Sequence, residues 1–174
     1  MTRPQDKTIL VVDDEPNVRT YLKTLLEDAG FKVVIAGDGV EALEIIRKSK
    51  PDFISLDLIM PRKSGQKLLF ELRRDRELSR IPVLIVTAHA RDDLGAEDLT
   101  DLLRNRVISG PGSYLEKPID PVTYVRSIQS ALGIEVSEEA VNRLGLKEEL
   151  RKSLEDASPE ALRKALEALR KAGG

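Results

Sequence analysis

The chain has 174 residues, enough for one domain or for one domain with an appendage, and it can bury a substantial core. Twenty-eight basic against thirty acidic residues give a net charge of −2, which offers no overall attraction to polyanions, and the absence of cysteine excludes disulfides and thiolate metal sites. No apolar run approaches the roughly 20 residues of a membrane span, and the polar N-terminus lacks the apolar region of a signal peptide. We therefore expect a soluble, cytoplasmic protein.

Strand and helix signals alternate along most of the chain. Apolar runs predict strands at Thr8–Val12, Lys32–Ala36, Asp52–Leu56, Ile81–Thr87 and Ser113–Glu116. Apolar residues at helical spacing predict helices after Pro16, after Gly39, after Ser64, over Asp92–Arg104 and over Pro121–Leu132. We expect Gly30 to end the first of these helices. Five β/α units in this order imply a parallel sheet with helices on both faces.

The segment 135–174 is helical in pattern but contains no aromatic residue. Ser137 is expected to begin a short helix that Gly145 ends, and a second helix carries Leu146, Leu150 and Leu154; Ser158 and Pro159 begin a third with Leu162, Leu166 and Leu169. Such leucine stripes need a partner surface, either the rest of the chain or another copy. Eight basic and nine acidic residues are dispersed along this segment, which argues against a DNA-reading domain.

Polar residues follow four of the predicted strands. In a parallel sheet these strand ends open on the same edge, so Asp13, Asp14, Asp57, Thr87 and Lys117 are expected around one pocket. Three carboxylates repel one another unless a divalent cation lies among them, and ligands that are all oxygen suit Mg²⁺. Asp57 can then attack phosphorus, because the metal and Lys117 screen the charge of the incoming phosphoryl group, to which Thr87 offers a hydroxyl.

Each of these residues also has a simpler interpretation when taken alone. Asp13 and Asp14 before a helix are also typical of an N-cap pair. Asp57 alone fits a turn after a strand, and Tyr114 alone fits the core. Their joint occurrence, in order, on five β/α units favours the functional interpretation.

The set resembles the receiver domain of two-component response regulators, over about Lys7 to Gly133. The residues that carry the resemblance are Asp13-Asp14, Asp57 with Met60-Pro61, Gly65, Thr87-Ala88 and Tyr114 to Pro118. It implies a flavodoxin-like, five-stranded, doubly wound parallel sheet. Residues 1–134 would form the phosphoacceptor domain, and residues 135–174 a small all-α extension.

The resemblance also implies a role for each site residue. The aspartate matching Asp57 takes a phosphoryl group from a histidine kinase or phosphotransfer protein, as in bacterial phosphorelays. Mg²⁺ would be bound by Asp14, Asp57 and the backbone carbonyl of Ile59, and by Asp13 through water; Thr87 and Lys117 would contact the phosphoryl oxygens. Tyr114 matches the aromatic switch position, and Ile59 and His89 match positions that set the lifetime of the phosphoryl group.

The stretch from Thr87 to Lys117 is longer than the family pattern by roughly two helical turns, in the region that typically forms the output face. We expect signalling through phosphorylation-dependent contacts with an unknown protein, and a homodimer through the C-terminal helices or the fourth-helix region stays open. The chain would catalyse only its own phosphorylation and dephosphorylation.

Two alternatives remain, a transcription regulator with a reduced DNA-binding tail and an aspartate-nucleophile phosphatase. The phosphatase ranks last, because Ile59 stands where such enzymes carry a second carboxylate.

Overall fold

A computed structural model describes residues 3–60, 64–88, 114–135 and 137–172. The chain divides into two compact units, residues 1–136 and residues 137–174. His89, Ser113 and the helix expected over Asp92–Arg104 lie outside the described residues. Among the helices that are described, none combines the length and the apolar character needed to cross a membrane.

The first unit is built on one sheet of five parallel strands in the order β2-β1-β3-β4-β5. The strands are β1 (Thr8–Val12), β2 (Lys32–Ala36), β3 (Phe53–Leu56), β4 (Val83–Thr87) and β5 (Tyr114–Glu116). The bounds expected for β1 and β2 are confirmed. β4 begins two residues later than expected, at Val83, since Pro82 has no N–H group with which to join the ladder.

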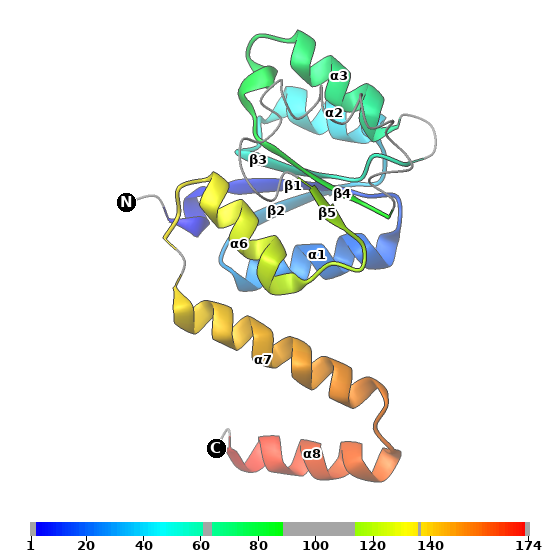
Figure 1. Cartoon of the computed structure of the whole chain (residues 1–174), viewed down its shortest axis with the longest axis vertical. Coiled ribbons are helices and arrows are strands. Elements are labelled where there is room, and N and C mark those ends of the chain that lie inside the picture. Colours follow the sequence, from blue (N-terminus) through cyan, green and yellow to red (C-terminus); the bar gives the residue numbers. More distant parts are fainter. Residues whose placement is uncertain (1–2, 61–63, 89–113, 136, 173–174) are drawn as a thin grey trace. The chain divides into compact units, whose positions relative to one another are not determined.

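Helices cover both faces of this sheet. They are α1 (Pro16–Asp28), α2 (Gly39–Lys48), α3 (Gly65–Arg74) and α6 (Pro121–Ala131), with short 3₁₀ turns η1 (Pro4–Asp6) and η2 (Leu78–Arg80). α2 and α3 lie on one face, and α1 and α6 lie on the other (Figure 1). The predicted doubly wound parallel sheet is therefore confirmed.

Local chemistry accounts for where these helices begin and end. The Asp38 carboxylate accepts hydrogen bonds from the N–H groups of Val40 and Glu41, which caps the first turn of α2. Gly30 ends α1 with a positive φ of 91°, and its N–H donates to the carbonyl of Glu27. This arrangement favours glycine because a side chain is strained at positive φ. The prediction for Gly30 is confirmed.

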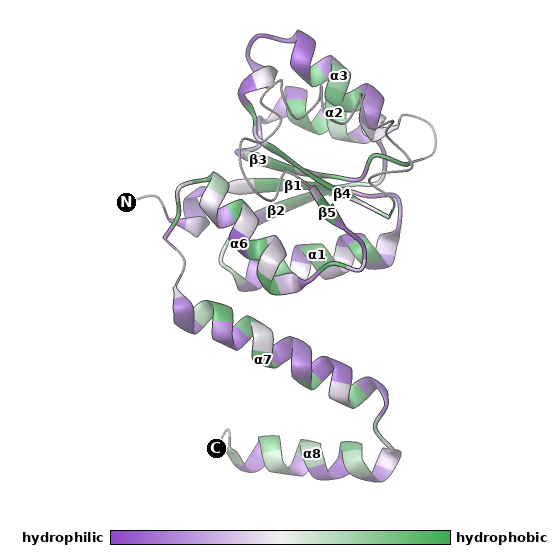
Figure 2. Ribbon diagram, in the orientation of Figure 1, coloured by the Kyte–Doolittle hydropathy of each residue, from purple (hydrophilic) through white to green (hydrophobic). Residues whose placement is uncertain are grey.

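The core lies between the sheet and the two helical layers. β3 and β4 are buried along their whole length, as expected for central strands covered on both faces. Side chains alternate along β1, so that Leu10 and Val12 join the cluster beneath α2 and α3 while Ile9 and Val11 are buried separately from it. Figure 2 shows the hydrophobic residues concentrated in the strands and on the inward sides of the helices.

The second unit consists of α7 (Glu138–Glu155) and α8 (Pro159–Ala172). The prediction that Gly145 ends a helix is wrong, because α7 continues through it. A glycine inside a helix costs only about 1 kcal/mol relative to alanine. Ser137 caps this helix, and Arg151 forms ion pairs with Glu148 and Glu155, so local interactions offset that cost.

The predicted start of the last helix is confirmed, since the Ser158 hydroxyl accepts a hydrogen bond from the N–H of Ala161 at 3.3 Å. The leucine stripes of this unit are largely exposed. The exposed fractions are 65% for Leu146, 44% for Leu150, 54% for Leu166 and 58% for Leu169.

Candidate functional site

The candidate site is built where the strands end. Asp13 directly follows β1, and Asp57 directly follows β3, where its N–H donates to the carbonyl of Val12 at 2.8 Å. Thr87 is the last residue of β4, and the N–H of Lys117 donates to its carbonyl at 3.0 Å. These bonds continue the sheet ladders beyond the strands, so the backbone fixes how the site residues approach one another.

Three carboxylates gather at this edge. One oxygen from each of Asp13, Asp14 and Asp57 lies within 4.8 Å of the other two. Asp13 is 1% exposed and Asp57 is 5% exposed, whereas Asp14 is half-buried. Carboxylates held this close repel one another, and a hard cation with oxygen ligands relieves that repulsion. The donor set therefore suits Mg²⁺.

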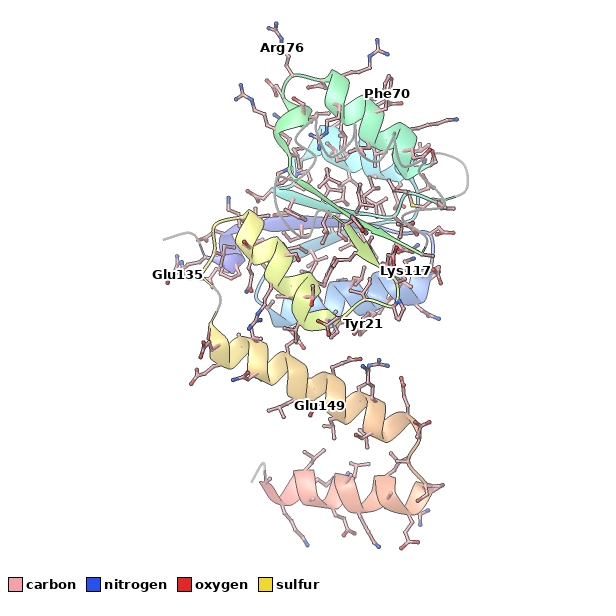
Figure 3. The ribbon with its side chains drawn as sticks, viewed as in Figure 1. Tyr21, Phe70, Arg76, Lys117, Glu135 and Glu149 are labelled. Carbon is pink, nitrogen blue, oxygen red and sulfur yellow. The ribbon has the colours of Figure 1, made fainter. Side chains whose placement is uncertain are left out.

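Lys117, which is labelled in Figure 3, is the cation that this cluster already contains. Its Nζ lies 2.9 Å from Asp13 Oδ2, 3.0 Å from Glu15 Oε1 and 3.1 Å from Asp57 Oδ2. Burial lowers the pKa of Lys117, but the carboxylates of Asp13, Glu15 and Asp57 outweigh burial and raise it. The amine is therefore held in its charged form. Glu15 is not among the residues predicted for the site, although an acidic residue directly after Asp13-Asp14 is a signal for it.

Burial raises the pKa of Asp57, and the neighbouring Asp13 acts in the same direction. The N–H of Ile59, which donates to Asp57 Oδ1 at 3.1 Å, and the charge of Lys117 only partly offset burial. The ionised form of this side chain is thus held in an environment that disfavours it. A bound cation at the carboxylate would relieve the unfavourable charge.

Gly65 lets the first turn of α3 approach the acceptor loop closely. Its N–H donates to the carbonyl of Leu58 at 3.0 Å. A Cβ atom at position 65 would lie 2.0 Å from the carbonyl oxygen of Asp57 and 2.7 Å from the Cα of Leu58. The backbone therefore tolerates only glycine here. The sequence predicts that a helix begins near this position, and Gly65 is one of the residues that carry the receiver resemblance. The close contact with Asp57 is not evident from the sequence.

Arg19 holds the loop that carries the acidic pair. Its Nη1 donates to the backbone carbonyl of Asp13 at 2.6 Å, and the N–H of Glu15 donates to Asp13 Oδ1 at 2.9 Å. The first bond fixes the backbone of the loop, and the second fixes the direction of the Asp13 side chain. Arg19 is not among the residues predicted for the site, because a basic residue early in a helix carries no particular signal.

The remaining predicted site residues differ in how they face the site. Thr87 is fully buried, and its hydroxyl oxygen has no hydrogen-bond partner among the described residues. Tyr114 is partly buried and packs against the hydrophobic core cluster. Ile59 is 51% exposed, at the rim. Nothing is described for His89.

Comparison with known proteins gives the class of this fold and site. Residues 9–129 match the response regulator receiver domain. Protein PilH of Pseudomonas aeruginosa is 34% identical over 124 residues, which cover 71% of this chain and 96% of PilH. The probable transcriptional regulator ycf27 of Porphyridium aerugineum is 34% identical over 128 residues, or 74% of this chain. The chain spans only 49% of that regulator.

A solved structure gives the same result. The receiver domain of the sensor histidine kinase PA1611 from Pseudomonas aeruginosa PAO1, which has a magnesium ion coordinated in its active-site cleft, superposes with a TM-score of 0.62. Sequence identity is 26%, and the match covers 73% of this chain and 98% of that one. The chain belongs to the response regulator receiver domain family. Receiver domains are signalling modules that are phosphorylated on an aspartate and interact with histidine kinases or phosphotransfer proteins.

Proposed function

We propose that this protein is a response regulator that accepts a phosphoryl group on Asp57 in a Mg²⁺-dependent reaction. The donor would be a histidine kinase or a histidine phosphotransfer protein. The observation that carries the proposal is the position of Asp57, which is 5% exposed, lies among the acidic oxygens and is 3.1 Å from Lys117 Nζ. Asp13 shares these acidic partners and lies 2.9 Å from Lys117 Nζ. The choice of Asp57 over Asp13 therefore rests on its position directly after β3, which matches the acceptor aspartate of receiver domains.

The reaction follows from these residues. A carboxylate oxygen of Asp57 attacks phosphorus and forms a new P–O bond, while the P–N bond to the donor imidazole breaks and its electron pair leaves with the imidazole. Asp14, Asp57 and the Ile59 carbonyl would hold Mg²⁺, with Asp13 acting through water, and the ion supplies charge neutralisation when it is bound. Lys117 screens the incoming oxygens, because it is charged and already lies beside Asp57.

Two further residues would act after transfer. The Thr87 hydroxyl, which is buried and has no partner among the described residues, would donate to a phosphoryl oxygen. Movement of Thr87 would reorient Tyr114 as a switch. The apolar side chain of Ile59 at the rim would hinder attack by water, and His89 would also influence the lifetime of the acyl phosphate.

In this proposal, residues 1–134 are the phosphoacceptor domain and residues 135–174 are a helical extension of a cytoplasmic protein. Output would occur through phosphorylation-dependent contacts with another protein, or through self-association of the extension. The similarity to ycf27 favours transcription regulation as a second candidate. The nearly balanced charges of segment 135–174 argue against DNA reading by this tail.

The test is labelling by a small phosphodonor. With acetyl phosphate and Mg²⁺, the intact mass should rise by one phosphoryl group, and Asp57→Asn or EDTA should prevent the rise. Asp52→Asn is a matched control, because Asp52 precedes β3 at the end opposite to Asp57. It should be labelled like the unaltered protein. Strong labelling of Asp57→Asn would refute the assignment.

A further inference from the structure

Phe70 is an aromatic side chain that the core does not use. The chain has six aromatic residues, all of them described, and Phe70 is the only one that is mostly exposed. Its exposed fraction is 61%, against 4% for Phe31 and 0% for Phe53. Figure 3 shows its ring directed outward from α3. One exposed phenylalanine is not unusual by itself, so its surroundings decide whether it has a role.

Cations flank Phe70 on the same helical face. Lys67 lies three residues before it and Arg74 four residues after it, which places all three side chains in one stripe along α3. Lys67 and Arg74 are both exposed, and the Arg74 guanidinium lies 5.5 Å from the centroid of the Phe70 ring. We call Lys67, Phe70 and Arg74 the α3 stripe. It combines one apolar face with positive charge on both sides.

The fold does not depend on this stripe. The opposite side of α3 carries Leu68, Leu69 and Leu72, all with no exposed surface, and these residues belong to the core cluster. Ser64 caps the helix through its hydroxyl. Changes to the α3 stripe should therefore leave the domain folded.

We propose that the α3 stripe docks an acidic amphipathic segment of a partner protein. An apolar side chain of that segment would cover the Phe70 ring, and its carboxylates would pair with Lys67 and Arg74. This surface is separate from the phosphoacceptor cluster, so the inference goes beyond the proposed function and does not require it.

Charge favours an acidic protein segment over a nucleic acid. Glu71, Asp75 and Glu77 are interspersed with the cations on α3 and in the residues after it, and Asp75 and Glu77 are exposed. A continuous phosphate backbone that followed this helix would meet these carboxylates. A short segment that ends beside Arg74 avoids most of them. The occupant that fits is therefore compact, acidic and partly apolar.

The test uses a short fluorescein-labelled helical peptide with leucines at i, i+3, i+4 and i+7 and glutamates elsewhere. Two companion probes replace either the glutamates by lysines or the leucines by glutamines, and a labelled DNA duplex is the fourth probe. Fluorescence anisotropy with the full chain should show binding of the acidic leucine peptide and weaker binding of the other three. Phe70→Ala, and the pair Lys67→Glu with Arg74→Glu, should each weaken that binding about tenfold.

Matched controls lie on the neighbouring helix α2. Val40→Ala removes another exposed apolar side chain, and Lys48→Glu reverses another exposed charge, and both should keep affinity within about twofold. Equal loss in the α2 and α3 variants would overturn the proposal. So would tighter binding of the duplex or of the lysine peptide. Circular dichroism melting of each variant establishes that any lost binding is not lost folding.

Discussion

The two ends of strands β1 and β3 carry ionic clusters of opposite character. At the amino end, Lys7 Nζ lies 2.8 Å from Asp52 Oδ1, and the N–H of Thr8 donates to Asp52 Oδ2 at 2.8 Å. One anion therefore meets one cation and one backbone donor. At the carboxyl end, Lys117 is shared by Asp13, Glu15 and Asp57 within 3.1 Å.

The two aspartates that flank β3 consequently differ in the sign of their pKa shifts. Burial would raise the pKa of Asp52, but the hydrogen bonds from Lys7 and Thr8 outweigh it and lower the pKa. Burial raises the pKa of Asp57, and its bonds do not compensate. The ion pair of Asp52 stabilises the fold. The crowded carboxylates around Asp57 are instead suited to binding a cation or to taking part in a reaction.

The largest expected effect tests how closely α3 packs against the loop at the carboxyl end of β3. Gly65→Ala places a Cβ atom 2.0 Å from the Asp57 carbonyl oxygen, so the acceptor loop or α3 must shift. We expect a loss of about 3 kcal/mol in the free energy of unfolding, measured by urea denaturation. Gly133→Ala is the control. It has a positive φ of 64° but nothing within 4 Å, and it should lose only about 1 kcal/mol.

The second prediction removes the lysine from each cluster. Without Mg²⁺, Lys117→Met leaves buried carboxylates without their cation and should destabilise the protein by about 2 kcal/mol. Added Mg²⁺ should restore part of this loss. Lys7→Met breaks a more exposed pair and should lose about 0.5 kcal/mol with no response to Mg²⁺. Thermal melting with EDTA and with Mg²⁺ distinguishes the two variants. Equal losses of stability would contradict the difference between the clusters at the two ends of the strands.

The third prediction is a substitution that stabilises the protein, whereas the first two destabilise it. Because the pKa of Asp57 is raised in the folded state, its favourable contribution is present below the unfolded value of about 3.8 and is lost as pH rises through the folded value. At neutral pH in EDTA, Asp57→Asn should therefore stabilise the protein, by on the order of 1 kcal/mol. Urea denaturation at pH 7 measures this gain. Destabilisation there would contradict the cause given for the raised pKa.

The smallest effect belongs to Asp52. Its pKa is lowered in the folded state, so its contribution is present above about 3.8 and is lost as pH falls through the folded value. Asp52→Asn should lose about 0.5 kcal/mol at pH 7, because solvent screens this pair. The difference in stability between the variant and the unaltered protein should shrink as the pH is lowered below 4. Unfolding can be followed by the fluorescence of an added dye. A loss that did not depend on pH would rule out the charge as its source.

Much of the sheet followed from sequence because its signals are local. The apolar runs of β1 and β2 and the turn glycine at Gly30 need no distant partner to be recognised. The gathering of Asp13, Asp57 and Lys117 followed from one rule, that parallel strands end on the same edge. The roles of these residues remain proposals.

What the sequence could not supply depends on contacts and on sums of small energies. The approach of Gly65 to the Asp57 carbonyl exists only after α3 packs. The bond from Arg19 to the Asp13 carbonyl likewise needs the turn between β1 and α1. The helix α7 continues through Gly145 because one unfavourable helix propensity is outweighed by the interactions of the neighbouring residues.

The end of α6 determines where the chain can be cut. The N–H of Gly133 donates to the Ser130 carbonyl, and the N–H of Ile134 donates to the Gln129 carbonyl at 2.9 Å, while the Ile134 side chain is only 6% exposed. A shortened chain that stops after Ile134 thus closes its own final turn. A chain that stops at Leu132 leaves the carbonyls of Ser130 and Gln129 without these hydrogen bonds and removes the buried side chain of Ile134. Proteolysis or shortening to isolate the first unit should therefore spare Ile134.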